Sequence, residues 1–137
     1  MILPNGGGGY QVGDGNLDEP LIDAIPLPVS IAATATLTPA QVLNGLILTN
    51  SGVTASQTYT LPTVADLEAV LVNSDKVGTS FTFRVVNLGT SSGTAVIAAG
   101  TGWTVSGSLT MTIPVTTGAA MVARKSATGA WTLYRVT

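Results

Sequence analysis

Six short stretches after Gly78 alternate apolar and small polar residues, and this alternation restricts the fold more than any other feature. Glycine, serine, threonine and asparagine separate the stretches, as expected of turns. A period of two residues places successive side chains on opposite faces of a strand. Several short strands at regular spacing are typical of a β-sandwich or jelly roll. The predicted strands are 80–87, 94–99, 103–107, 108–114, 119–125 and 130–137.

The residues before Gly78 predict further strands and one helical turn. Residues 29–38 alternate alanine, valine or isoleucine with serine or threonine, so we expect one half-buried strand there. Residues 46–50 form a short apolar strand that runs into a turn. Between these strands, residues 39–45 fit a single helical turn that ends at Gly45.

A clearer helix follows Pro62. Thr63 is a favourable N-cap residue, and Asp66 stands at the spacing of a capping box. Leu67, Val70 and Leu71 share one face, which predicts a helix that packs over one end of the β body.

The front of the chain differs in composition from the rest. Residues 1–27 contain four consecutive glycines and several prolines, which disfavour both helix and central strand. We expect an extended N-terminal arm over residues 1–27 and one β domain over residues 28–137, with a solvated tail as the alternative for the arm. If the arm docks on another surface, its candidate anchors are Ile2, Leu3, Tyr10, Leu17, Leu21 and Ile22.

Charge is scarce and unevenly placed. Charged residues make up 9% of the chain, far below the usual quarter, so much of the surface is expected to be covered in an oligomer. All four charged residues before Thr38 are acidic, whereas the later residues carry five cations and three carboxylates. There is no basic run for nucleic acid and no apolar run of membrane-spanning length. We therefore expect neither nucleic acid nor a membrane as a partner. No positive region followed by a long apolar region, as in a signal peptide, is visible at the N-terminus, so we expect synthesis in the host cytoplasm.

The residues offer little for catalysis. Histidine and cysteine are absent, which removes imidazole bases, thiolates and ordinary zinc sites. "GTSSG" at 89–93 matches a nucleophile elbow centred on Ser91, but it joins two predicted strands and is read as a hairpin turn. The stretch 14–19 begins like a calcium loop but has Glu19 where that loop needs glycine. We expect no enzyme activity, no cofactor and no metal.

The aromatic residues leave two interpretations open. Exposed aromatic rings can line a sugar-binding groove, and the best candidate is Trp103, which follows Gly102 in a predicted turn. Alternatively, Trp103, Trp131 and Tyr59 belong to the core or to subunit contacts. The remaining aromatic residues considered for a groove are Tyr10 and Tyr134.

Residues 38–137 resemble the β domain of tailed-phage capsid decoration (cement) and head-fibre proteins. The resemblance rests on the order of "TLPTVADL", "VGTSFTFRVVN", "AAGTGWTVSGS" and "GAWTLYRV". It implies an all-β, jelly-roll-like sandwich with one short helix and an extended arm, assembled as a homotrimer. It further implies a virion protein that binds the major capsid protein on the outer head surface and stabilises the capsid. A head fibre, a tail appendage or a lectin-like carbohydrate-binding module is the alternative.

Overall fold

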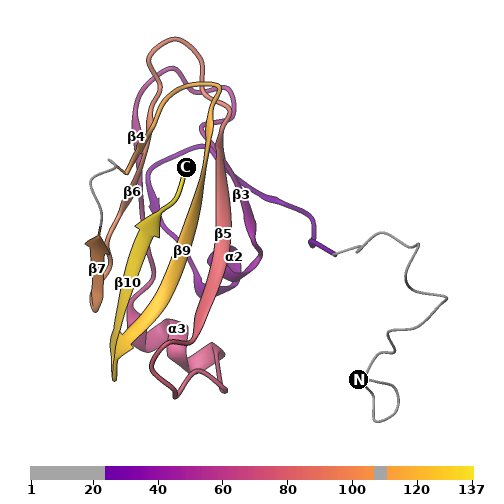
Figure 1. Cartoon of the computed structure of the whole chain (residues 1–137). Helices are drawn as coiled ribbons and strands as arrows, with labels where there is room; N and C mark the ends of the chain where they lie inside the picture. Colours follow the sequence, from indigo (N-terminus) through magenta and orange to yellow (C-terminus); the bar gives the residue numbers. More distant parts are fainter. Residues whose placement is uncertain (1–23, 107–110) are drawn as a thin grey trace, which may run out of the picture.

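Two β-sheets face each other across an apolar core (Figure 1). The computed structural model describes residues 24–106 and 111–137, and it has few helical residues beside its strands. In chain order the elements are β1 (Val29–Ile31), β2 (Ala35–Thr36), α2 (Pro39–Leu43), β3 (Leu46–Thr49), β4 (Gln57–Thr60), α3 (Val64–Val70), β5 (Ser80–Asn87), β6 (Ala95–Ala98), β7 (Trp103–Ser106), β8 (Thr112–Ile113), β9 (Gly118–Ala127) and β10 (Ala130–Arg135).

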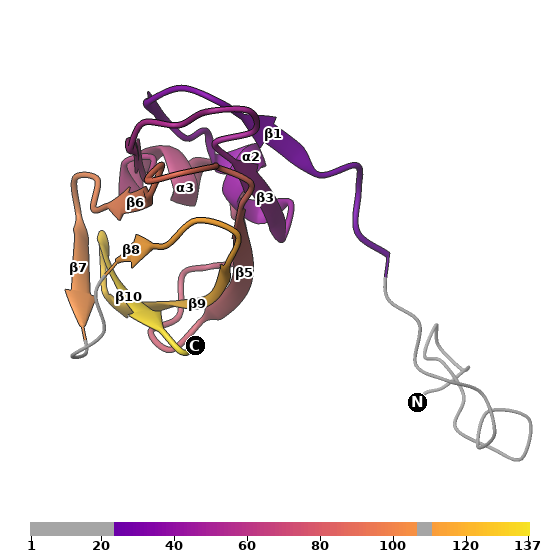
Figure 2. The same ribbon diagram turned by 90° about the horizontal axis from the view of Figure 1, so that it is seen from above.

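The chain passes from one sheet to the other at almost every strand. The larger sheet has the order β1-β3-β5-β9-β10-β7 and the smaller one β2-β4-β6-β8. Strands β1, β3 and β5 pair in parallel, as do β2, β4 and β6. The first six strands therefore stack as three successive turns of a coil, each turn giving one strand to each sheet. Viewed from above, β6 and β8 lie across the core from β5, β9 and β10 (Figure 2).

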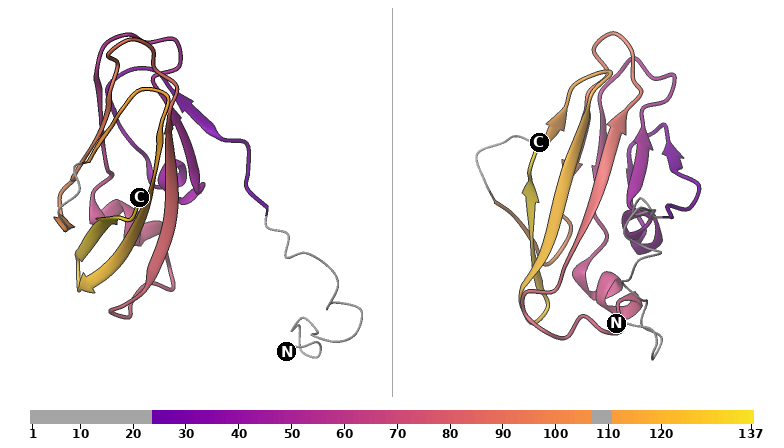
Figure 3. Two further views of the ribbon diagram at one scale, coloured as in Figure 1. Left: turned by 45° about the horizontal axis from the view of Figure 1, so that its top comes forward. Right: turned by 45° about the vertical axis from the view of Figure 1, so that its right-hand side comes forward.

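Antiparallel strands complete the body. β9 pairs antiparallel with β5 and β10, and β8 pairs antiparallel with β6. The right-hand view of Figure 3 shows β1, β3, β5, β9 and β10 side by side. The β-rich, two-sheet prediction is confirmed. However, five of the eight strand pairings between described residues are parallel, whereas the strands of a jelly roll pair antiparallel.

Inward-facing residues of both sheets make one continuous core. Its largest fully buried side chains are Trp131, Tyr59 and Phe83. Stacking across the coil brings Ile47 beside Val85 in the larger sheet, so equivalent positions of successive turns share the core. In β10, buried Trp131 and Leu133 alternate with half-buried residues, as the period of two predicts.

Helix α3 begins at its predicted N-cap residue, whereas the capping box lies on α2, where it was not predicted. The Thr38 hydroxyl accepts from the Gln41 amide, and the Gln41 side chain accepts from the Thr38 amide, which closes a capping box on α2. Gly45, at φ +90°, ends this short helix because glycine alone adopts that angle without strain. Thr63 caps α3 by accepting from the amide of Asp66.

The predicted apolar face of α3 is wrong in one respect. Val64 and Leu67 are the buried residues of this helix, and Leu71, its C-cap residue, is half-buried. Val70 is 55% exposed instead of packing on the core.

Two strand predictions also need correction. Residues 29–38 form two short strands in different sheets, because the chain turns at 32–34 and the Thr34 amide donates to the Gln57 side chain. "GTSSG" does make a turn, but not a hairpin, because it connects β5 of the larger sheet to β6 of the smaller one. Of the predicted strand 108–114, the described part forms β8.

Candidate functional site

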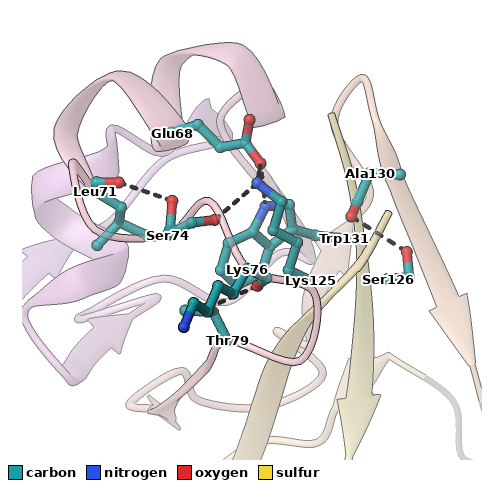
Figure 4. A network of polar contacts seen from close by, with 9 residues as sticks. All are labelled: Glu68, Leu71, Ser74, Lys76, Thr79, Lys125, Ser126, Ala130 and Trp131. Atoms are coloured by element: carbon teal, nitrogen blue, oxygen red, sulfur yellow. Dashed lines mark hydrogen bonds and ion pairs between the residues drawn. The ribbon is translucent and has the colours of Figure 1, made fainter. Parts of the chain in front are cut away.

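A charged network joins helix α3 to the larger sheet (Figure 4). The Lys125 ammonium on β9 lies 2.7 Å from Glu68 Oε1 on α3. It also donates to the carbonyl of Ser74 at 2.7 Å, in the loop that follows the helix. The Trp131 indole N–H donates to the same carboxylate oxygen at 3.0 Å. One carboxylate thus connects three elements of the fold.

The two charges of this network differ in exposure. The Lys125 side chain is 5% exposed and that of Glu68 is 25% exposed. Hydrogen bonds from Lys125 and then Trp131 lower the pKa of Glu68, and burial opposes this only partly. Asp66, the other carboxylate of α3, accepts from the Thr63 hydroxyl at the start of the helix. The geometry of the network is that of a clamp that holds α3 on the sheet.

A second polar cluster, formed by Asn50, Asn87 and Tyr59, lies buried where the coil turns between sheets. The Asn50 and Asn87 side-chain amides both donate to the carbonyl of Gly93, at 2.8 and 2.9 Å. The Tyr59 hydroxyl faces Asn50 Oδ1 and the Ile31 carbonyl, and burial raises its pKa. We call this set the amide cluster.

The sequence analysis did not single out the amide cluster, although a signal exists. Asn50 follows the last residue of β3 and Asn87 is the last residue of β5, and each is followed two residues later by glycine. Buried amides at these points satisfy backbone carbonyls of the connecting turns, which water cannot reach. The repeated N-x-G therefore marks two corners of the coil.

Ser91 lies on the surface beyond the amide cluster. It is exposed and has φ +55°. The chain has no histidine to activate it. Within residues 24–106 and 111–137 no three potential metal-ligating side chains come together.

The positions of the aromatic residues decide between the sugar-binding groove and the core. Trp103 is 8% exposed, and its indole N–H donates to the carbonyl of Pro62 at 2.8 Å. Trp131 and Tyr59 are fully buried, so the core assignment of all three is confirmed. The Trp103 ring packs 6.1 Å from that of Trp131 and presents no open face for a sugar ring.

The outward side of β5, β9 and β10 forms a surface that we call the cationic face. Arg84 and Arg124 are exposed there, and the one ion pair found between described residues is Lys125–Glu68. A hollow of about 230 Å³ lies beside Arg84 and is bordered by Gly118, Ala120 and Thr137. The face comprises Thr82, Arg84, Val86, Ala120, Val122, Arg124, Thr132 and Tyr134.

Residues 24–28, the arm root, lead away from the body before β1 (Figures 1 and 3). Leu27 is 90% exposed, and Ile25 is exposed as well. The Asn44 side-chain amide, at the end of α2, donates to the carbonyls of Leu27 and Leu46 and fixes the point of departure. The six predicted anchors all lie outside the described residues: Ile2, Leu3, Tyr10, Leu17, Leu21 and Ile22.

An apolar patch is formed by exposed residues at the end of α3 and in the loop that follows it. Val70, Val72 and Val77 are all more than half exposed, and we call them the valine patch. A hollow of about 310 Å³ beside them is lined by Leu71, Ser74 and Thr79. Scattered exposed apolar residues are normal, but Val70 and Val72 line the same hollow, which favours a contact surface.

Known proteins do not supply an assignment. No family model, curated protein or solved structure matches the chain. Among the described helices, neither has the length and apolar character needed to cross a membrane. The function is therefore inferred from the residues and surfaces above.

Proposed function

We propose that this chain is a capsid decoration protein of a tailed phage, a structural protein without enzyme activity. In this role it binds the outer head surface as a homotrimer and holds neighbouring major capsid proteins together. The observation that carries the proposal is the arm root, which leaves a tightly bonded β body with Ile25 and Leu27 exposed. The resemblance of residues 38–137 to cement proteins gives the class of partner.

The interior of the body favours a scaffold over a catalyst. Lys125 and Glu68 bond to each other and to neighbouring elements, and the amide cluster bonds to backbone carbonyls. Catalytic groups need a reacting atom within reach, whereas these groups are occupied by the fold itself. A body of this kind is suited to hold its shape on a large particle.

The surface favours an oligomer. The chain has few charges, and the valine patch and the cationic face are both open in the single chain. A homotrimer covers part of this surface and carries three arms. Three arms on one particle raise the effective concentration of each after the first has bound, so weak single contacts give strong attachment.

Deletion of residues 1–27 tests the proposal. We expect the truncated protein to keep the β circular dichroism spectrum and the trimer mass, because the buried core begins at Leu37. The deletion removes the Leu27 carbonyl that accepts from the Asn44 side chain, but this hydrogen bond is exposed. In co-sedimentation with expanded, undecorated heads of the encoding phage, its occupancy should fall at least about tenfold because the multivalent arms are lost.

Two full-length variants sharpen this test. Serine at all six anchors should reproduce the loss of head binding, since the apolar grip is removed. Serine at Asn5, Gln11 and Asn16 should leave binding intact, since these residues are polar already. Wild-type occupancy by the truncated protein would refute the role of the arm.

A further inference from the structure

The cationic face has charges without partners among the described residues. Arg84 and Arg124 project from it, and no carboxylate of the described part lies within ion-pair distance of either. The three described acids, Asp66, Glu68 and Asp75, belong to α3 and the loop after it. Between the two arginines, Thr82 and Val122 lie opposite each other on neighbouring strands.

The chain contains a segment of complementary chemistry. Residues 14–23 hold four carboxylates and no cation, together with Leu17, Leu21 and Ile22. Acidic and apolar residues together match a face on which two arginines flank small and aliphatic side chains. We propose that residues 14–23 of a neighbouring copy bind the cationic face, so that exchanged arms reinforce an oligomer that the β bodies already form. Ile2, Leu3 and Tyr10 then remain as the anchors of the arm on the capsid.

The spacing of the charges supports simultaneous contact. Arg84 pairs in register with Ala120, four residues before Arg124 on β9, so the two arginines are separated along the strands by about 13 Å. Asp14 and Asp18 are also four residues apart, and in an extended chain their side chains point the same way at about the same spacing. A segment lying along the strands then pairs both carboxylates with both guanidinium groups.

The course of the arm root favours the face of another copy over that of its own body. Pro26 and Pro28 fix their own φ angles, and each favours an extended residue before it. Residues 24–28 accordingly lead away from their own body instead of turning back over it (Figures 1 and 2). From Asp14 to Ala24 an extended chain spans up to about 33 Å, which is about the length of the ten-residue strand β9.

This contact requires an oligomer but no capsid, so it holds or fails independently of head binding. Because the native chain has no cysteine, introduced cysteines report the contact without background. Asn16 lies midway between Asp14 and Asp18, and Thr82 lies midway between the levels of the two arginines. In the full-length variant N16C/T82C, mild oxidation should give covalent oligomers on a non-reducing gel.

Three controls make the result specific. N16C/T128C places the second cysteine in the exposed turn between β9 and β10, away from the face, and should cross-link about tenfold less because no docked arm holds the thiols together. R84E/R124E in N16C/T82C should lower the yield at least about fivefold through like-charge repulsion, and K76E should not. Adding D14K/D18K to R84E/R124E should restore the yield, because both charge pairs are reversed.

Four results would refute the proposed contact. Disulfides confined to single chains would show that the arm binds its own body. Equal yields for T82C and T128C would show random collision. A monomeric mass for the wild-type protein by light scattering would also refute it. So would a cross-linking yield that R84E/R124E leaves unchanged.

Discussion

The charged network of Figure 4 predicts an asymmetry between its two partners. In Glu68→Gln the carboxylate becomes a neutral amide that still accepts from Trp131, so the loss is that of charge alone. In Lys125→Met the chain keeps its length and apolar stem while the ammonium is removed. We expect the glutamine variant to be the less stable of the two, because its remaining charge is the buried one.

The magnitudes follow from exposure. Breaking a buried ion pair by removing one partner costs about 3–5 kcal/mol. We expect a smaller loss of about 2–3 kcal/mol for Glu68→Gln, because the Glu68 side chain is 25% exposed and the new amide still accepts from Trp131. Lys125→Met leaves a carboxylate that water can reach and a Ser74 carbonyl without its donor, which costs about 1 kcal/mol. For a body of this size, 1 kcal/mol shifts Tm by about 4 °C, so the variants should differ by about 4–8 °C.

The same network gives the stability a pH dependence. The pKa of Glu68 is lower in the folded state than its unfolded value of about 4.3, so the unfolded state takes up the proton first as pH falls. The stabilisation is therefore complete above the unfolded pKa and is lost as pH falls through the folded pKa. Glu68→Gln removes this contribution, so its stability should fall less steeply in that range.

Urea unfolding at pH 7 and at pH 3–4, followed by tryptophan fluorescence, measures both effects. The double variant Glu68→Gln with Lys125→Met completes a cycle, and its cost should be smaller than the sum of the single costs by at least about 1 kcal/mol. The reasoning is refuted if Lys125→Met is the more destabilising substitution, or if Glu68→Gln lies within about 0.5 kcal/mol of wild type.

Two further substitutions probe the coil. Tyr59→Phe removes the hydroxyl that bonds Asn50 and the Ile31 carbonyl, so we expect the free energy of unfolding in urea to fall by about 2 kcal/mol. Tyr134→Phe, on the open face, is the control and should be nearly neutral. Equal effects of the two substitutions would contradict a buried role for the Tyr59 hydroxyl. Gly100→Ala drives a β-carbon into the carbonyl oxygen of Leu61 and should lower Tm by about 10 °C, whereas Gly129→Ala, with open space around it, should cost about 1 kcal/mol. A silent Gly100→Ala would show that β4 and β6 can separate there.

Local signals in the sequence were sufficient for most element boundaries. Thr63 caps α3 as predicted, and the alternation in β10 fixes which of its residues are buried. These features depend on neighbours within a few residues, so one stretch of sequence contains the whole cause.

The course of the chain between sheets could not be predicted in the same way. A period of two is unchanged when a chain leaves one sheet and enters the other, which is why 29–38 was predicted as one strand. Likewise, a glycine- and serine-rich turn at 89–93 fits a hairpin and a sheet-to-sheet corner equally well. Parallel pairing depends on partners far apart in sequence, such as Ile47 with Val85.

The buried polar groups were the least predictable part of the candidate site. Lys125 stands in β9 at an inward position where lysine is uncommon, and only the position of α3 explains it. Trp103 illustrates the reverse case, since its place after a glycine turn suggested exposure and the Pro62 carbonyl instead holds it inside. The six arm anchors remain predictions.

The stacked turns of the body have a consequence for how such a protein can change in length. Each turn contributes one strand to each sheet and rests on its neighbour, while β9 and β10 seal the far side. Duplicating the stretch from β3 to β4 would insert another layer about 4.8 Å thick without disturbing that seal. Longer or shorter versions of this body are therefore accessible by gain or loss of whole layers, and a layer copied from β3 to β4 would bring its own corner asparagine, Asn50.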